Sequence, residues 1–173
     1  TLPTSVGIVA PPVTYAVDCE QYVAVMAGYG GAGALTSGDP RTMATGRFVN
    51  DGYVLAFKLD GKATLPRIAE KNRAIPDPPR IEVTPAQLEN GQYAYMRSCM
   101  VCHGALVVSG GVIPDLRMLD AGKHAIFREI VFDGVIHAAG MPRFGDLLTE
   151  QDVRDIQAYV ISRANQDRAA VKK

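Results

Sequence analysis

The stretch SCMVCHG, residues 98–104, decides how the second half of this chain is interpreted. Cys99 and Cys102 are separated by two residues, and His103 follows immediately. Thiol and imidazole groups at this spacing are compatible with a covalent haem, a zinc ion or a redox-active disulfide. The residues elsewhere in the chain have to distinguish these three chemistries.

A c-type haem accounts for the spacing best. Each thiol adds to one haem vinyl group, so the two sulfur atoms must lie about one helical turn apart, and His103 then points at the iron. Zinc is a weaker interpretation, because a structural zinc site needs four ligands and the remaining histidines are His124 and His137. A thioredoxin-like disulfide is expected at the start of a helix, whereas here a predicted helix precedes the cysteines.

Two downstream residues complete the expected haem site. The carbonyl of Pro114, in GGVIPDLR (110–117), is the expected acceptor for the second ring nitrogen of His103. Met141, in AGMPRF (139–144), is the expected sixth iron ligand, because the glycine and proline beside it allow its loop to approach the iron. Histidine and methionine ligation together favour reversible electron transfer. Met118 and His137 are the alternatives for the sixth position.

Arg117 lies close in sequence to the predicted acceptor of the His103 hydrogen bond. Guanidinium groups bind carboxylates through paired hydrogen bonds, so Arg117 is a candidate partner for a haem propionate. A plain surface salt bridge is the competing interpretation. Cys19, the remaining cysteine, is expected to be an ordinary turn or buried thiol.

The first part of the chain, residues 1–66, is predicted to be β-rich. The runs VTYAV (13–17), QYVAVMAG (21–28) and YVLAFKLDG (53–61) are rich in β-branched and aromatic side chains, and the first two predict a hairpin. Two or three strands cannot bury both faces of a sheet. This part is therefore expected to pack against something else.

The rest of the chain divides into a linker and a helical part. Residues 67–83 contain closely spaced prolines, which favour an extended, semi-rigid spacer. From residue 84 the pattern is helical, with Thr84, Asp120 and Thr149 as the expected N-caps of three helices.

Buried faces can be assigned to these helices by their spacing. The second helix is expected to bury Ile126, Ile130 and Val131. The third is expected to bury Val153, Ile156, Val160 and Ala164. Tyr95 and Tyr159 are expected to pack the first helix against the last.

The composition argues against several classes of function. The chain has 18 basic and 18 acidic residues, so no basic stripe indicates nucleic-acid binding. Apolar residues make up 47% of the chain, which is normal for a packed globular protein. The longest uncharged apolar run, residues 23–35, contains glycines and is shorter than a membrane span of roughly 20 residues. No transmembrane segment is expected.

Residues 84–173 resemble class I cytochrome c domains throughout. The resemblance rests on GQYAYMRSCMVCHG (91–104), VIPDLR (112–117) and GMPRF (140–144), followed by a long final helix. It implies an all-helical domain with one covalent haem c. Cys99 and Cys102 would anchor the haem, and His103 and Met141 would ligate its iron.

Residues 1–66 resemble the last blade and closing strands of the β-propeller of pyrroloquinoline quinone (PQQ) dehydrogenases. The resemblance rests on GIVAPPVTYAVDCEQYVAVMAGYGGA (7–32) and GRFVNDGYVLAFKLDGKATLP (46–66). The order of propeller end, linker and cytochrome c is that of quinohaemoprotein alcohol dehydrogenases. The implied fold class is α+β in separate domains: terminal propeller strands over 1–66, a linker over 67–83 and an all-α cytochrome c domain over 84–173.

In that family a propeller holding PQQ and calcium oxidises an alcohol, and the haem passes the electrons to an external acceptor. The resemblance implies that this chain is the electron-transfer portion of such a periplasmic oxidoreductase, with the rest of the propeller and a small redox protein or quinone as partners. The PQQ, the calcium and the catalytic residues belong to the propeller portion, so no catalytic residue is expected in this chain. The alternative is a stand-alone c-type cytochrome, or a cytochrome subunit that docks on a separate dehydrogenase.

The chain departs from the family at the predicted hairpin turn. The family usually has Asp-Gly there, whereas this chain has Asp18-Cys19. A two-residue turn of this type requires positive φ, which a cysteine adopts at some energetic cost.

Overall fold

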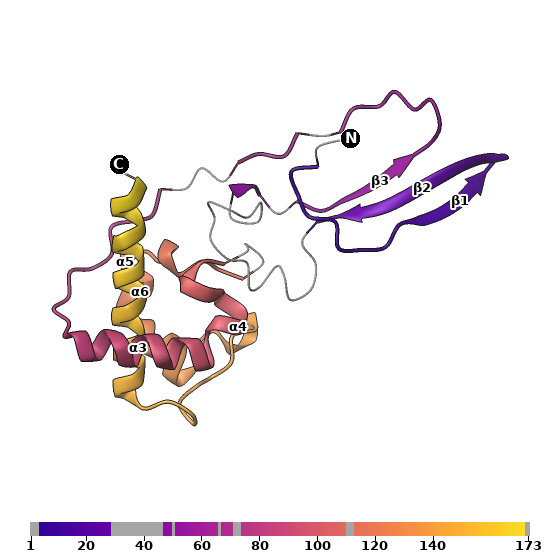
Figure 1. Cartoon of the computed structure of the whole chain (residues 1–173). Helices are drawn as coiled ribbons and strands as arrows, with labels where there is room; N and C mark the ends of the chain where they lie inside the picture. The colour runs from indigo at the N-terminus through magenta and orange to yellow at the C-terminus, as the bar shows by residue number, and fades with distance from the viewer. Residues whose placement is uncertain are drawn as a thin grey trace.

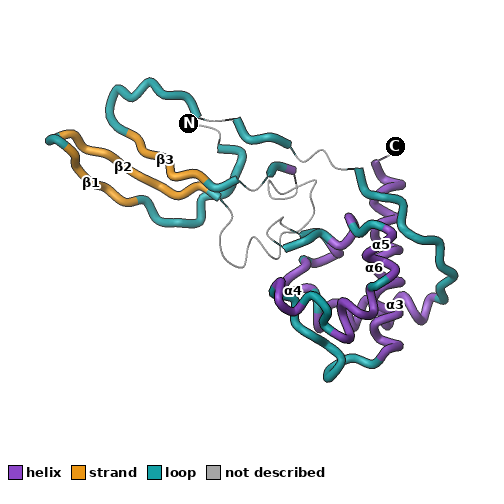
Figure 2. Tube along the Cα trace, turned by 180° about the vertical axis from the view of Figure 1, so that it is seen from behind, coloured by secondary structure: helices purple, strands orange, loops and turns teal. Residues whose placement is uncertain are grey.

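The structure is a computed structural model that describes residues 4–28, 47–49, 51–65, 67–70, 74–109 and 113–171. Figure 1 shows the strands on one side of the molecule and the main helices gathered on the other. The same segregation is visible from behind in Figure 2, where the strands belong to the N-terminal part of the chain and the long helices to the C-terminal part. The small sheet and the helices predicted from the sequence are both present.

The sheet is antiparallel and three-stranded in the order β1-β2-β3. The strands are β1 (Val13–Val17), β2 (Glu20–Ala27) and β3 (Tyr53–Phe57). The predicted hairpin is confirmed: β1 pairs with β2, and the turn between them has positive φ at both Asp18 (50°) and Cys19 (63°). Cys19 is an exposed free thiol.

The sheet has only a small core of its own. Val6, Ala27 and Ile68 are buried there, and Ile68 comes from the predicted linker. Every residue of β1 is exposed. Apolar side chains elsewhere in the sheet are exposed too, with Met26 at 64% and Val54 at 73%. This exposure fits the expectation that three strands cannot bury both faces of the sheet.

The helical part begins at the predicted capping box. The Thr84 hydroxyl accepts from the Gln87 backbone N–H at 3.2 Å, and the Gln87 side chain accepts from the Thr84 N–H at 3.0 Å. Four elements follow in this half of the helical part: α3 (Pro85–Ser98), α4 (Met100–His103), η1 (Ala105–Val107) and η2 (Leu116–Met118).

The second half of the helical part starts at Asp120, which caps as predicted by accepting from the Lys123 N–H at 2.8 Å. Its elements are α5 (Ala121–Ala125), the π-helical turn η3 (Glu129–Asp133), η4 (His137–Ala139) and α6 (Glu150–Val171). Thr149 caps α6, accepting from the Asp152 N–H at 3.1 Å. Among the described residues, no helix is both long and apolar enough to cross a membrane.

The prediction that Ile126 is buried is wrong. Its side chain is 46% exposed, whereas Val131 is buried at 3% and Ile130 is partly buried. The physical reason is that α5 ends at Ala125 and the chain resumes as a π-helical turn. A periodicity of 3.6 residues does not continue across this break.

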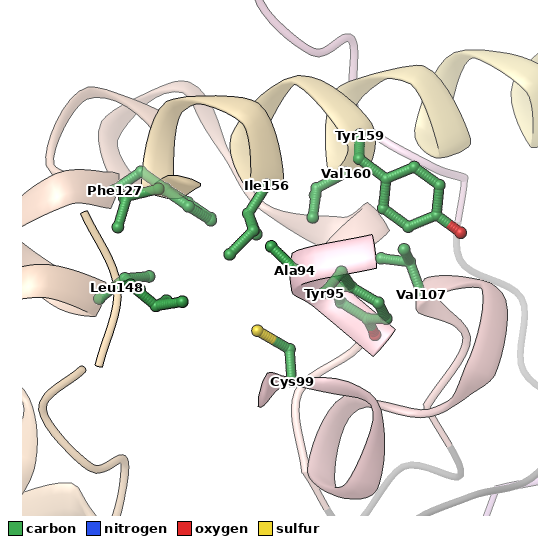
Figure 3. Close-up of a cluster of buried hydrophobic side chains, with 11 residues drawn as sticks. Ala94, Tyr95, Cys99, Val107, Phe127, Leu148, Ile156, Tyr159 and Val160 are labelled. Atoms are coloured by element: carbon green, nitrogen blue, oxygen red, sulfur yellow. The ribbon is translucent and has the colours of Figure 1, made fainter. Parts of the chain in front are cut away.

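The main core lies where α3 crosses α6 (Figure 3). Tyr95 and Tyr159 pack these helices together as predicted, with ring centroids 5.5 Å apart. The predicted core residues of α6 are all buried: Val153, Ile156, Val160 and Ala164. Gly91 allows the close crossing, because a Cβ atom there would lie 2.0 Å from the Asp155 carbonyl oxygen.

Candidate haem site

The junction of α3 and α4 positions the two cysteines of the motif. Cys99 stands between the helices, and its N–H donates to the Tyr95 carbonyl at 2.8 Å. The N–H groups of Cys102 and His103 both donate to the Cys99 carbonyl, at 3.2 and 2.9 Å. The thiols therefore lie on one tight helical turn, the spacing that attachment to one haem requires.

The two thiols have different surroundings. Cys99 is buried and Cys102 is exposed. Burial raises the pKa of the Cys99 thiol to about 12, so this group is protonated at neutral pH. In Figure 3 the Cys99 sulfur points toward the side on which Leu148 and Ile156 lie.

His103 is buried and held by the residue expected from the sequence. Its Nδ1 lies 2.9 Å from the Pro114 carbonyl oxygen. A carbonyl only accepts, so Nδ1 carries the proton and Nε2 presents a lone pair. Burial lowers the pKa of the imidazole, although the Pro114 carbonyl acts in the opposite direction. A neutral ring with a free Nε2 is suited to ligate iron, and that role stays a prediction.

Tyr95 and Gly104 fix the exit of the chain from the motif. The Tyr95 hydroxyl donates to the Gly104 carbonyl at 2.7 Å. Gly104 has a φ of 81°, and a Cβ atom there would lie 2.0 Å from the Val108 carbonyl oxygen. The hydroxyl contact was missed from the sequence, since helical spacing indicated only that the Tyr95 ring packs against α6.

Met141 lies in the loop after η4, partly buried against the main core. Two hydrogen bonds join this loop to η3: Phe144 N–H to the Val131 carbonyl at 3.0 Å, and Gly145 N–H to the Phe132 carbonyl at 3.1 Å. A Cβ atom at Gly145 would lie 2.6 Å from the Phe132 oxygen. The glycine after GMPRF is therefore a positioning residue that was missed from the sequence.

His137 and Met118, the alternative candidates for the sixth iron ligand, lie in η4 and η2. His137 is exposed in η4, and Met118 is partly buried in η2 beside Arg117. The choice of Met141 as sixth ligand stays a prediction.

Arg117 is buried rather than on the surface. Its guanidinium pairs with Asp115 at 2.6 Å and with Asp167 of α6 at 2.9 Å. The structure thus contains an ion pair, the competing sequence interpretation, in a buried setting. The predicted contact with a haem propionate stays a prediction.

The residues present fit a covalent haem. The motif offers two thiols and an unprotonated imidazole nitrogen. Leu116, Leu119, Ile130 and Phe144 pack against the main core while remaining partly exposed. Such side chains would supply apolar surface for a flat, largely apolar group, with Cys99 and Cys102 as its covalent anchors and His103 as a ligand to its iron.

Comparison with known proteins first defines the class. Residues 86–160 match the family described as cytochrome c oxidase, cbb3-type, subunit III. The helical part is therefore a cytochrome c domain, and its cofactor is haem c. The prediction that this part of the chain carries haem c is confirmed. The roles of Cys99, Cys102 and His103 in holding that haem stay predictions.

Relatives that match nearly the whole chain define its family more closely. It is 41% identical over 170 residues to the quinohaemoprotein alcohol dehydrogenase ADH IIB of Pseudomonas putida, covering 96% of this chain and 24% of the relative. It is 40% identical over 162 residues to the dehydrogenase subunit of a quinone-type alcohol dehydrogenase of Acetobacter aceti, covering 92% and 21%.

Solved structures agree. The quinohaemoprotein alcohol dehydrogenase ADHIIG of Pseudomonas putida HK5 matches with a TM-score of 0.76 and 40% identity, over 94% of this chain and 23% of that one. The enzyme from Comamonas testosteroni matches with a TM-score of 0.65 and 34% identity, over 95% and 23%. The chain spans about a quarter of the length of these relatives. It corresponds to the C-terminal, cytochrome-containing region of quinohaemoprotein alcohol dehydrogenases, as the sequence resemblance implied.

Proposed function

We propose that this chain is the electron-transfer portion of a periplasmic quinohaemoprotein alcohol dehydrogenase. Cys99 and Cys102 hold a covalent haem c, and His103 and Met141 ligate its iron. The haem supplies a one-electron centre between reduced PQQ, held in the propeller portion together with calcium, and an external acceptor. That acceptor is a small redox protein or a quinone.

The observation that carries this proposal is the state of His103. Its Nδ1 is engaged by the Pro114 carbonyl, which leaves Nε2 unprotonated inside a two-cysteine attachment motif. His103 and Met141 would together occupy the protein-ligand positions of the iron, so a haem held by them would offer no open position for substrate or oxygen. This arrangement is typical of electron transfer rather than of catalysis at the metal.

The β-rich part supports the assignment to a larger dehydrogenase. We propose that residues 1–66 are terminal propeller strands, completed by further strands of the same enzyme. The exposed apolar side chains of β1, β2 and β3 support this, because a small sheet is stable only when its apolar face is packed against something. The match to alcohol dehydrogenases also runs through this part and not only through the cytochrome. A stand-alone carrier is therefore not favoured.

The proposed linker, residues 67–83, keeps the cytochrome close to its electron donor. A short tether gives the haem domain a high effective concentration at the propeller. Its contacts in the structure are with both neighbours: Ile68 packs under the sheet, and Asp77 forms an ion pair with Arg168 of α6. Pro78 is buried as well. These contacts support a linker whose described residues, 67–70 and 74–83, pack against both parts of the chain.

The covalent haem is tested by spectroscopy of the purified protein. The reduced pyridine haemochrome should show a c-type band that resists extraction with acidified acetone. The double variant Cys99→Ala, Cys102→Ala should lose the covalent haem, whereas Cys19→Ala is the matched control, because Cys19 is an exposed cysteine outside the motif. Extraction of the colour from the parent protein would refute the covalent assignment.

The electron-transfer role is tested in the full-length enzyme. After reconstitution with PQQ and calcium, an alcohol should reduce the haem. Residues 1–173 produced alone should show no such reduction. An intact mass near 18.5 kDa plus one haem for the native protein would support the stand-alone carrier instead.

A further inference from the structure

Four charged side chains form a continuous network of ion pairs between the Pro114 loop and α6. They are Asp115, Arg117, Asp167 and Arg163. Arg117 makes a paired contact with Asp115, with Nε to Oδ1 at 3.0 Å and Nη2 to Oδ2 at 2.6 Å. Its Nη1 donates to Asp167 Oδ2 at 2.9 Å. Asp167 in turn accepts from Arg163 Nη2 at 3.1 and 3.3 Å.

The two ends of this network of four charged side chains contact the segments that flank His103. Asp115 directly follows Pro114, whose carbonyl accepts from His103 Nδ1. At the other end, Arg163 Nε donates to the Leu106 carbonyl at 3.2 Å, in the turn that leaves the haem motif. Asp167 is the carboxylate that joins the two arginines, so it connects both segments to one helix.

The cluster is partly withdrawn from solvent. The Arg117 side chain is 9% exposed and that of Asp167 is 25% exposed. Such pairs are screened less than surface pairs, and the two-pronged arginine geometry adds directional constraint. By contrast, the pair of Arg154 with Glu150 on the same helix is 3.7 Å long, and its side chains are 59% and 49% exposed.

We propose that Asp167 is a positioning residue for the haem ligand, fixing through Arg117 the loop that presents the Pro114 carbonyl to His103 and through Arg163 the turn after the motif. This inference rests on the proposed function only in naming His103 as the iron ligand. It assigns Arg117 a positioning role as well, because three of its nitrogens are engaged by Asp115 and Asp167.

The hydrogen bond to Pro114 connects this geometry to a measurable property. Donation from Nδ1 makes the imidazole a stronger electron donor to a metal, and such outer contacts tune the metal. If the Pro114 loop loosens, the ring donates less, and the oxidised iron loses stabilisation. Loss of a nearby carboxylate charge acts in the same direction. The reduction potential should therefore rise.

The test compares Asp167→Asn with the parent in the haem-loaded protein. Two quantities are measured: the exchange rate of the His103 Nδ1 proton by NMR in the diamagnetic reduced state, and the haem reduction potential. We expect the exchange rate to increase about tenfold, taking as a guide the lower end of the 10–100-fold loss of metal affinity or activity that follows removal of an outer-shell partner. The one-electron equilibrium should shift toward the reduced form. Asp167→Glu should restore both.

Glu89→Gln is the matched charge control, because Glu89 is exposed on α3 and its replacement removes the same charge. It should leave both quantities unchanged. Arg117→Lys keeps the charge but loses the paired contact with Asp115 beside Pro114. It should therefore reproduce the faster Nδ1 exchange, and it decides the question if Asp167→Asn does not fold.

Two results would overturn the proposal. A shifted potential with an unchanged Nδ1 exchange rate would mean that Asp167 acts by charge alone. A lower melting temperature with both quantities unchanged would mean a purely structural role. A parent protein without covalent haem would refute the proposed function instead, and comparing Nδ1 exchange in the haem-free chains would still decide the role of Asp167.

Discussion

At the scale of single residues, His103 shows how the surroundings set a chemical state. The imidazole is buried beside a backbone carbonyl, and that carbonyl can only accept a hydrogen bond. The proton is therefore fixed on Nδ1, and the ring is held neutral. The backbone carbonyl of Pro114 therefore sets the tautomer of the imidazole that we propose as the iron ligand.

Met141 gives the most direct residue-scale prediction. Met141→Ala should remove the weak near-infrared sulfur-to-iron band. It should also lower the reduction potential by at least about 60 mV, a tenfold change in a one-electron equilibrium, because a thioether ligand raises the potential. Spectroelectrochemistry measures both. Met118→Ala is the matched control and should change neither, and an unchanged band in Met141→Ala would move the ligand elsewhere.

His124 predicts a pH dependence of stability. It is 6% exposed, and burial lowers its pKa from the ordinary value of 6.5. As the pH falls below 6.5, the His124 imidazole becomes protonated in the unfolded chain but stays neutral in the folded protein. Stability should therefore decrease toward the lower folded pKa, by at most about 1.4 kcal/mol per pH unit for this proton.

The measurement is urea unfolding of the haem-loaded protein between pH 7 and about pH 5. His124→Phe should show a shallower loss of stability with falling pH, because the ring that resists protonation is gone. His137→Gln is the control, since His137 is exposed. Equal slopes for the parent and His124→Phe would contradict the prediction.

At the scale of elements, the crossing of α3 and α6 depends on one glycine. A Cβ atom at Gly91 would lie 2.0 Å from the Asp155 carbonyl and 3.1 Å from Tyr159 Cβ. Gly91→Ala should therefore force the helices apart and destabilise the domain by about 1–3 kcal/mol or more, despite the better helix propensity of alanine. Denaturant unfolding followed by circular dichroism measures the loss.

Gly122→Ala is the matched control for this prediction. Gly122 is exposed in α5, and the nearest atom to its added Cβ is a side-chain oxygen of Asp120 at 3.3 Å. The substitution should be close to neutral. If Gly91→Ala unfolded at the same denaturant concentration as the parent, the close crossing of α3 and α6 would be wrong.

The same elements show what the sequence can and cannot predict. The caps at Thr84, Asp120 and Thr149 were predictable, because each depends on residues three apart. The buried face of α6 followed from a regular period. The burial of Ile126 was predicted wrongly because α5 ends just before it and the π-helical turn η3 follows, so the helical period of α5 does not continue.

Long-range contacts were harder to predict. The link from Arg117 to Asp167 joins residues 50 positions apart, and no local pattern encodes it. The crossing at Gly91 likewise depends on a helix far along the chain. The His103 to Pro114 contact was predictable only because metal-ligating histidines follow a general rule of outer-shell bonding.

At the scale of the whole molecule, the two halves differ in how complete they are. The helical part has a continuous hydrophobic core of its own, which includes Tyr95, Val153 and Val160. The sheet buries little more than Val6, Ala27 and Ile68. The helical part is therefore expected to be the more stable half of this chain, and the sheet to depend on neighbouring strands.

Met26 can report whether such strands cover the sheet. It lies in β2 opposite Val54 of β3, and these side chains are 64% and 73% exposed. If further propeller strands pack on this face in the full-length enzyme, peroxide should oxidise Met26 about tenfold or more slowly there than in a protein of residues 1–173. Peptide mass mapping measures the rate, with Met96 of α3, 40% exposed, as the internal reference. Equal Met26 oxidation rates in the two proteins would mean that this face of the sheet stays exposed in the full-length enzyme. The proposal that further propeller strands pack on this face would then be wrong.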